Sequence, residues 1–120
     1  MYDHIGLHVA DLEASIRFYT AALAPLGFVL CSRDEGVASF GRPDRPALWL
    51  YPAPGRNISG VHVAFRAPDH AAVDRFYKAG MAAGGRDNGG PGLRPDYTPT
   101  YYGAFLLDPD GNNVEAVCHG

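Results

Sequence analysis

Apolar and polar residues alternate in two short segments of the chain, residues 3–9 and 61–66. Strict alternation points every second side chain to the same face, which predicts a half-buried strand in each segment. The apolar face of each strand is expected to meet a core. The opposite face carries small or polar residues, namely His4, Gly6 and His8 in the first segment and His62, Ala64 and Arg66 in the second.

A helical pattern follows each of these strands. Apolar residues recur there at intervals of three or four, the spacing of one helix face. They are Leu12, Ile16, Tyr19 and Leu23 in the first helix and Val73, Phe76, Tyr77 and Gly80 in the second. Asp11 and Asp69 are predicted N-caps, because a carboxylate there accepts the free N–H groups of the first turn. Gly27 and Gly84–Gly85 are suitable helix ends.

Shorter strands are predicted after each helix, at residues 28–32, 37–40, 48–51, 101–107 and 113–118. The last two are joined by Asp108-Pro109-Asp110-Gly111-Asn112, which is typical of a hairpin turn because glycine supplies a positive φ there. Residues 86–100 are rich in Gly and Pro and show no periodicity. They are interpreted as a loop, with room for one short strand, and long loops in compact domains are often lids.

The chain contains an internal repeat. Residues 4–27 and 62–85 align without a gap and share nine identities in 24 positions, where chance gives about two at ordinary residue frequencies. Each copy alone is too small to bury its apolar face. The sequence therefore predicts an α+β fold of tandem βαβββ modules, about 1–55 and 58–120, within a single domain over 1–120. The sheets are expected to form a half-open mixed-sheet cup, with the helices on the outer face.

Composition narrows the functional classes. Apolar residues make up 47% of the 120 residues, enough for a core, and the net charge is −3. Without a basic run, a nucleic-acid partner or an electrostatic membrane partner is not expected. No apolar stretch is long enough for a membrane span, and no signal peptide is recognisable. Cys31 and Cys118 lack the spacing of a zinc finger or a disulfide framework, so a reduced, cytoplasmic domain is expected.

The face predicted to line the cup carries a candidate metal site. His4 and His62 occupy the same position in the two copies, and alternation in the last strand turns Glu115 to the same side. Two imidazoles and one carboxylate on neighbouring strands make a three-ligand set that leaves positions open for water or substrate. A lone histidine in a strand is more often a packing or surface residue. The repetition at one register favours the metal site.

These features resemble the vicinal oxygen chelate superfamily, which includes glyoxalase I, extradiol dioxygenases, fosfomycin-resistance transferases, methylmalonyl-CoA epimerase and bleomycin-resistance proteins. The resemblance rests on the tandem modules, the opening segment 3–9, the repeated Phe-Tyr at 18–19 and 76–77, and the closing segment 107–115. It implies one divalent ion, Zn, Ni, Mn, Fe(II) or Co, held by His4, His62 and Glu115. The shared chemistry of the superfamily is chelation of two neighbouring substrate oxygens, which stabilises an enolate or oxyanion.

The resemblance leaves the reaction open between lyase, isomerase, transferase and dioxygenase. Trp49 aligns with Glu115, so the first module supplies no fourth ligand, which argues against lactoylglutathione lyase proper. Glu115 and His8, as a general base, are the candidate catalytic residues, and Arg66 is expected to bind a substrate carboxylate or phosphate. Tyr97, Tyr101 and Tyr102 are expected to wall the pocket, although packing would serve as well for these aromatics.

Two classes of function and one assembly are predicted. The first class is a metal-dependent enzyme acting on a small oxygenated molecule. The alternative is a metal-free, ligand-sequestering protein of the bleomycin-resistance type. A homodimer is expected, because relatives of this size are commonly dimers and an open cup leaves strand edges to cover. The apolar segment 48–51 is either part of that interface or, for Trp49, turned into the cup.

Overall fold

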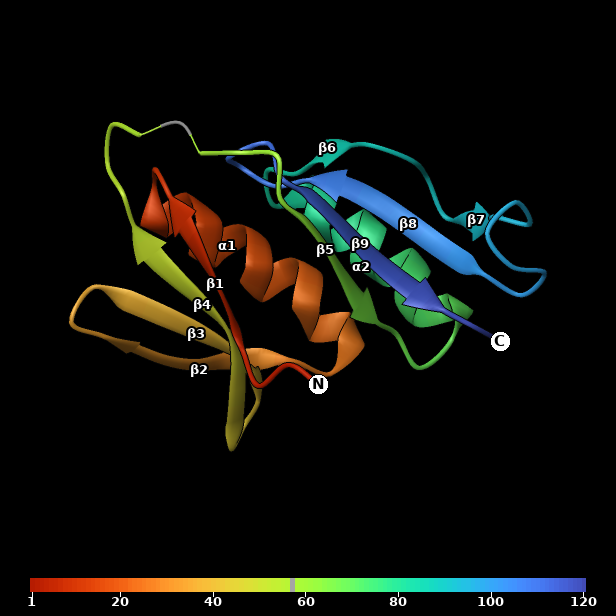
Figure 1. Ribbon diagram of the computed structural model, residues 1–120, viewed down its shortest axis with the longest axis horizontal. Helices are drawn as coiled ribbons and strands as arrows, with labels where there is room; N and C mark the ends of the chain where they lie inside the picture. Colours follow the sequence, from red (N-terminus) through yellow and green to blue (C-terminus); the bar gives the residue numbers. More distant parts are fainter. Residues whose placement is uncertain (57) are drawn as a thin grey trace.

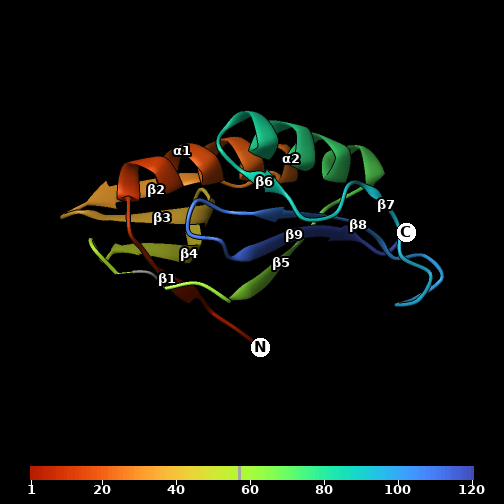
Figure 2. The ribbon, with the colours of Figure 1, turned by 90° about the horizontal axis from the view of Figure 1, so that it is seen from above.

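The computed structural model describes residues 1–56 and 58–120 and has two sheets with the helices packed on one side of them (Figures 1 and 2). The first module consists of β1 (Ile5–Val9), α1 (Leu12–Leu23), the short 3-10 helix η1 (Ala24–Leu26), β2 (Val29–Asp34), β3 (Val37–Arg42) and β4 (Arg45–Pro52). The second consists of β5 (His62–Arg66), α2 (His70–Ala82), β6 (Arg86–Asp87), β7 (Gly92–Leu93), β8 (Tyr102–Leu107) and β9 (Asn113–Cys118). The α+β prediction is confirmed.

Each module builds one sheet, and the two sheets repeat the same topology. The strand order is β1-β4-β3-β2 in the first and β5-β9-β8-β6 in the second, where β7 also pairs with β8. The opening strand of each sheet lies at its edge and runs parallel to the last strand. Gly6 is opposite Trp49, and Ala64 is opposite Glu115. The register therefore places Trp49 and Glu115 at equivalent positions, as the sequence alignment predicts.

Two strands of the first module are longer than predicted, and the loop of the second module contains two very short strands instead of one. β4 begins at Arg45 rather than at residue 48, and β3 extends to Arg42. Polar residues at the tip of this hairpin interrupt the apolar pattern, so the sequence did not indicate that β3 and β4 continue to pair there. Within residues 86–100, two pieces of two residues each pair with β8, where the sequence left room for one short strand.

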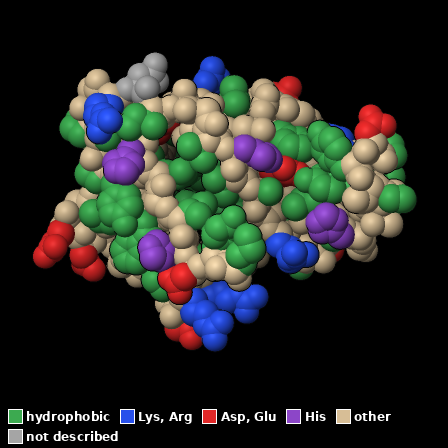
Figure 3. Space-filling model, viewed as in Figure 1, with side chains coloured by type: hydrophobic (Ala, Val, Ile, Leu, Met, Phe, Trp, Pro, Cys, Tyr) green, Lys and Arg blue, Asp and Glu red, His purple; other side chains and the backbone are tan. Residues whose placement is uncertain are grey.

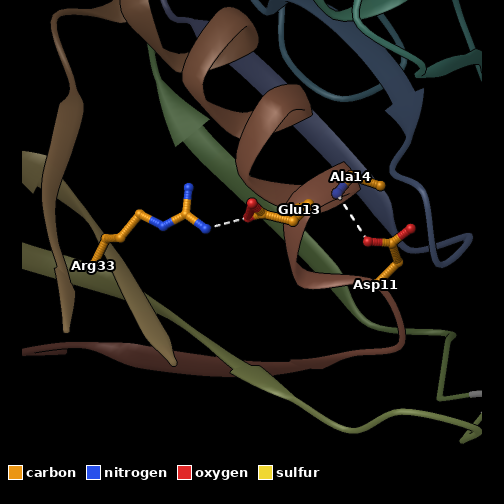
Figure 4. A network of polar contacts seen from close by, with 4 residues as sticks. All are labelled: Asp11, Glu13, Ala14 and Arg33. Carbon is orange, nitrogen blue, oxygen red and sulfur yellow. Dashed lines mark hydrogen bonds and ion pairs between the residues drawn. The ribbon is translucent and has the colours of Figure 1, made fainter. Parts of the chain in front are cut away.

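Both predicted N-caps are present. The carboxylate of Asp11 accepts from the backbone N–H of Ala14 at 3.1 Å, and that of Asp69 accepts from Ala72 at 2.8 Å. Figure 4 shows the first cap beside an ion pair between Glu13 in the first turn of α1 and Arg33 on β2. The helix of each module is therefore held at its N-terminus by the repeated aspartate, and α1 is also tied to its own sheet.

The core lies between the sheets and the helices. Val9, Phe18, Leu50, Phe76 and Leu106 are almost completely buried and belong to one continuous apolar cluster. The helices lie side by side over this core (Figure 2), so the two modules share it. The opposite face of the sheets is left open, and it carries the candidate site. Among the described residues, no helix is long and apolar enough to cross a membrane.

Candidate functional site

The central feature of the open face is a pair formed by His62 and Glu115. His62 begins β5 and Glu115 lies in the neighbouring strand β9. The imidazole Nε2 is 3.1 Å from the carboxylate Oε1. Glu115 is only 1% exposed, while the His62 side chain is 51% exposed. A buried carboxylate thus points outward beneath an accessible imidazole, as alternation along β9 predicts.

The orientation of His62 is fixed by the backbone. Its Nδ1 lies 3.1 Å from the carbonyl oxygen of Asn113. A carbonyl oxygen can only accept a hydrogen bond, so Nδ1 carries the proton. This leaves Nε2 directed at Glu115. A histidine that binds a metal through one nitrogen usually donates the other N–H to a carbonyl or carboxylate, and His62 has this arrangement.

Tyr101 completes the surroundings of the carboxylate. Its hydroxyl donates to Oε2 of Glu115. Burial and this hydrogen bond raise the pKa of Tyr101 well above its ordinary value, which keeps the hydroxyl protonated. A Cβ at Gly103 would lie 3.2 Å from the Tyr101 ring and 3.3 Å from Oε2 of Glu115. Because Gly103 has no side chain, the Tyr101 ring and the Glu115 carboxylate have room to come into contact.

The third predicted ligand does not join this pair within one chain. Among residues 1–56 and 58–120, no three His, Cys, Asp or Glu side chains form a group that could hold a metal ion. His4 comes just before β1, while His62 begins β5. In Figure 1, β1 runs upward and β5 downward, so the starts of these strands lie at opposite ends of the space between the sheets. The expectation that His4 joins His62 and Glu115 in one metal site is therefore wrong for the described part of the single chain.

His4 instead lies on an open hollow of about 980 Å³ over the first sheet, whose lining includes Trp49 and Tyr51. Its Nδ1 is 2.7 Å from the carboxylate of Asp3. His8 is exposed and lies beside Tyr51, with ring centroids 5.6 Å apart. The lining of this hollow supports the interpretation in which Trp49 faces the cup of its own module.

The remaining predicted residues fall in different places. Tyr97 is 61% exposed and lines a hollow of about 250 Å³ in the second module. Arg66 lines another hollow, together with Arg42, rather than the one beside Glu115. Tyr102 is a correction: its hydroxyl donates to Asp74 of α2 at 2.6 Å, so it faces the helix and does not wall the cup. Alternation explains this, because successive side chains of a strand point to opposite faces.

Three residues near the site, Phe105, Arg94 and Asn113, were not predicted from the sequence. Phe105 lies on the cup face of β8 and stacks on His62, with centroids 6.4 Å apart. Arg94 lies over the ring of Phe105. Asn113 has a buried side-chain oxygen with no hydrogen-bond partner among the described residues. For Phe105, alternation along β8 was a usable signal, whereas Arg94 lies in a loop without periodicity.

An apolar hollow of about 220 Å³ separates the two sheets. Figure 3 shows hydrophobic side chains gathered over the middle of this face, with histidines around them. Residues from both modules line the hollow, among them Ile5, Phe28, Val63 and Phe65. Asp3 and His4 of the first module also line this hollow, whose surface is otherwise mainly apolar.

The fold resembles known proteins over nearly the whole chain. The model of the Glyoxalase/Bleomycin resistance protein/Dioxygenase superfamily matches residues 2–116. A glyoxalase/bleomycin resistance protein from Albidiferax ferrireducens T118 is 30% identical, with 98% of each chain covered and a TM-score of 0.83. A glyoxalase/dioxygenase from Nostoc punctiforme is 27% identical, with 100% of this chain and 91% of that chain covered and a TM-score of 0.72.

A glyoxalase I mutant from Zea mays is 28% identical over 97% of this chain but only 46% of that chain, with a TM-score of 0.71. The present chain thus spans about half of that protein. No match was found among curated proteins. The chain belongs to the glyoxalase/bleomycin resistance/dioxygenase superfamily, as its family match and its tandem fold show.

Proposed function

We propose that the chain is a metal-dependent enzyme that binds a small oxygenated molecule. In this proposal His62 and Glu115 of one chain and His4 of a second copy hold one divalent ion. The observation that carries it is the pair itself: Nε2 of His62 lies 3.1 Å from Oε1 of Glu115, while Nδ1 faces the Asn113 carbonyl. The donor types and their orientation suit a divalent metal.

The third ligand is assigned to a second copy because one chain keeps its own His4 apart from the pair. The His4 side chain is 54% exposed, so a neighbouring chain can reach it. A twofold dimer would bring each His4 to the partner's pair and form two equivalent sites, since one symmetric contact serves both chains.

Free thiols at Cys31 and Cys118 are consistent with the cytoplasmic location expected from the sequence.

A bound divalent ion would supply Lewis acidity to neighbouring oxygens of the substrate. The protein groups have separate tasks. Tyr101 holds Oε2 of Glu115 and so orients the carboxylate. The Asn113 carbonyl fixes the ring of His62. The reaction is proposed to be that of a lyase, isomerase, transferase or dioxygenase, the four classes that the resemblance leaves open. His8 is proposed as the general base.

A second candidate function is metal-free sequestration of a ligand, as in the bleomycin-resistance type. The contact that favours it is the Tyr101 hydroxyl on Glu115, because this bond satisfies one carboxylate oxygen without an ion. Aromatic rings also surround the site: Tyr97 and His119 both lie edge-on to Tyr101, with centroids 5.0 and 5.2 Å away. Such a cluster suits an aromatic or cationic ligand.

Metal content distinguishes the two functions. Purified protein would be loaded separately with Zn²⁺, Mn²⁺, Ni²⁺, Fe²⁺ and Co²⁺, desalted, and analysed for bound metal. We expect about one ion per chain for at least one metal, and loss of it in Glu115→Gln and His62→Ala. The control His70→Ala, on the helix side, should retain it, because His70 stacks on Tyr102. Retention of no metal by any sample would support sequestration instead.

A metal-binding result would be followed by an activity screen with each bound metal. The substrates are catechols, glutathione hemithioacetals, epoxide phosphonates and 2-oxo or 2-methyl thioesters, one set for each reaction class of the superfamily. Turnover that disappears in Glu115→Gln and persists in His70→Ala would assign the class. Metal-independent turnover of these substrates would contradict the proposal.

A further inference from the structure

A small hollow lies next to the His62–Glu115 pair and has no role in holding the ion. Its volume is about 250 Å³, which suits part of a small ligand rather than a large one. It is connected to the pair through Asn113, whose carbonyl orients His62. The hollow is lined by Asn88, Gly89, Arg94, Tyr97, Phe105 and Asn113.

Arg94 is held in a fixed position in this hollow. Its Nη2 donates to the carbonyl oxygen of Gly90 at 2.6 Å, and its guanidinium lies 5.3 Å from the centroid of the Phe105 ring. A Cβ at Gly92 would lie 3.2 Å from Nη1, and one at Gly89 would lie 3.4 Å from Nη2. The glycine-rich segment thus leaves space for a guanidinium, and the loop orients the side chain before any ligand binds.

The charge of Arg94 is left without a counterion. In the described part of the chain, no carboxylate lies within ion-pair distance of it. A guanidinium has five N–H donors in a planar fork that matches a carboxylate, and the Gly90 carbonyl engages one end of that fork. The charge of Arg94 also influences Tyr101. Burial raises the pKa of the Tyr101 hydroxyl, whereas the positive charge of Arg94 lowers it.

The side chain of Asn113 provides the second polar group. Its Oδ1 is buried and has no hydrogen-bond partner among the described residues. Buried polar atoms are nearly always hydrogen-bonded, so such an atom calls for a donor. Asn113 and Arg94 line the same hollow, so a small molecule that pairs with Arg94 lies beside Asn113 and can donate to Oδ1 once the Asn113 side chain turns toward it.

We propose that this hollow is a subsite for a small hydroxy acid, whose carboxylate pairs with Arg94 and whose hydroxyl donates to Oδ1 of Asn113. Phe105 and Tyr97 flank the carbon skeleton. One part of this assignment rests on the proposed function: the orientation of the acid, with its oxygen atoms toward His62 and Glu115. Binding of the carboxylate at Arg94 is a property of the second module alone.

The test uses calorimetric titration of metal-free protein with three probes. Mandelate carries both groups, phenylacetate lacks the hydroxyl, and mandelamide lacks the charge. We expect mandelate to bind about ten-fold or more tightly than mandelamide, and several-fold more tightly than phenylacetate. Arg94→Gln should weaken mandelate binding to the level of mandelamide. The control Arg75→Gln, on the exposed side of α2, should bind mandelate as the wild type does.

A pair of loop variants separates the position of Arg94 from folding of the loop. A Cβ at Gly92 contacts Nη1 of Arg94, whereas one at Gly90 meets nothing within 4 Å. Gly92→Ala should weaken mandelate binding, and Gly90→Ala should leave it intact. Equal binding of mandelate and mandelamide, no mandelate binding, or stronger binding of inorganic phosphate than of mandelate would overturn the subsite. Because no metal is present, these results are independent of the metal-content test.

Discussion

The hydroxyl of Tyr19, in α1 of the first module, donates to the carboxylate of Asp108, in the hairpin of the second, at 2.6 Å. Both residues are completely buried. Asp108 also accepts from the backbone N–H groups of Asp110 and Asn112 and from the Asn112 side chain. The hairpin that carries β9, and with it Glu115, is thereby attached to the helix of the other module.

Removal of the Tyr19 hydroxyl should therefore destabilise the whole chain. We expect Tyr19→Phe to lower the free energy of unfolding by about 1–3 kcal/mol, because a buried carboxylate loses one of its donors. The internal repeat supplies a matched control. Tyr77 occupies the equivalent position but donates to exposed Asp87, so Tyr77→Phe should cost clearly less. Urea unfolding of both variants measures the difference, and equal losses would contradict this role of the contact.

The same buried tyrosine predicts how stability depends on alkaline pH. Burial, followed by the charge of Asp108, raises the pKa of Tyr19 well above its ordinary value of 10.0. Above pH 10 the unfolded chain loses this proton while the folded chain keeps it, so stability falls as the pH rises. The slope from this residue is about 1.4 kcal/mol per pH unit.

Unfolding free energies measured from neutral pH to above pH 10 provide the check. Below the ordinary pKa of tyrosine, wild type and Tyr19→Phe should differ by a constant amount. Above it, the wild type should lose stability more steeply than the variant, and the two curves should converge. Parallel curves throughout would show that Tyr19 ionises equally in the folded and unfolded states.

Alternation and repetition were sufficient to predict the parts of the fold that depend on local pattern. The period of two in the opening strands assigned His62 and Arg66 to the open face, and both are exposed. The same period turned Glu115 toward His62. The repeat aligned Trp49 with Glu115, and the strand register agrees. Each of these inferences needs only neighbours along or across one sheet.

The errors concern relations between sheets and the chemistry of the loop. Whether His4 meets His62 depends on how two separate sheets are placed, and no periodicity within either one encodes that. Tyr102 was grouped with Tyr101 by proximity in the chain, although adjacent strand residues face opposite ways. Arg94 was not recognised, because its position depends on glycines and a ring that contact it only in the folded chain.

Close packing of α2 on β8, and on α1 of the first module, makes Gly80 intolerant of a side chain. A Cβ there would lie 2.3 Å from Cδ1 of the buried Leu106 and 3.3 Å from the ring of Phe18. Alanine favours a helix over glycine by about 0.5–1 kcal/mol, but overpacking costs about 1–3 kcal/mol. We expect Gly80→Ala to lower the urea midpoint, whereas Gly90→Ala should not. A higher midpoint for Gly80→Ala would mean that the interface between helix and sheet yields easily.

The proposed dimer makes two predictions that can be measured without a substrate. Sedimentation at micromolar concentration should show about 26 kDa, twice the 12.9 kDa of one chain, for an interface of ordinary size. A single species of about 13 kDa would contradict the assembly. His4→Ala and Glu115→Gln should each remain dimeric, since each changes a metal ligand and leaves the apolar surfaces intact.

Mixing those two variants tests whether the sites are shared between chains. Each variant alone should bind no metal, because every site in its homodimer lacks one ligand. In a mixed dimer, the Glu115→Gln chain contributes an intact His4, and the His4→Ala chain contributes intact His62 and Glu115. One of the two sites is then complete. After exchange of subunits, bound metal should rise from near zero toward about one ion per mixed dimer. If each ion were held within a single chain, no combination of the two variants would recover any metal.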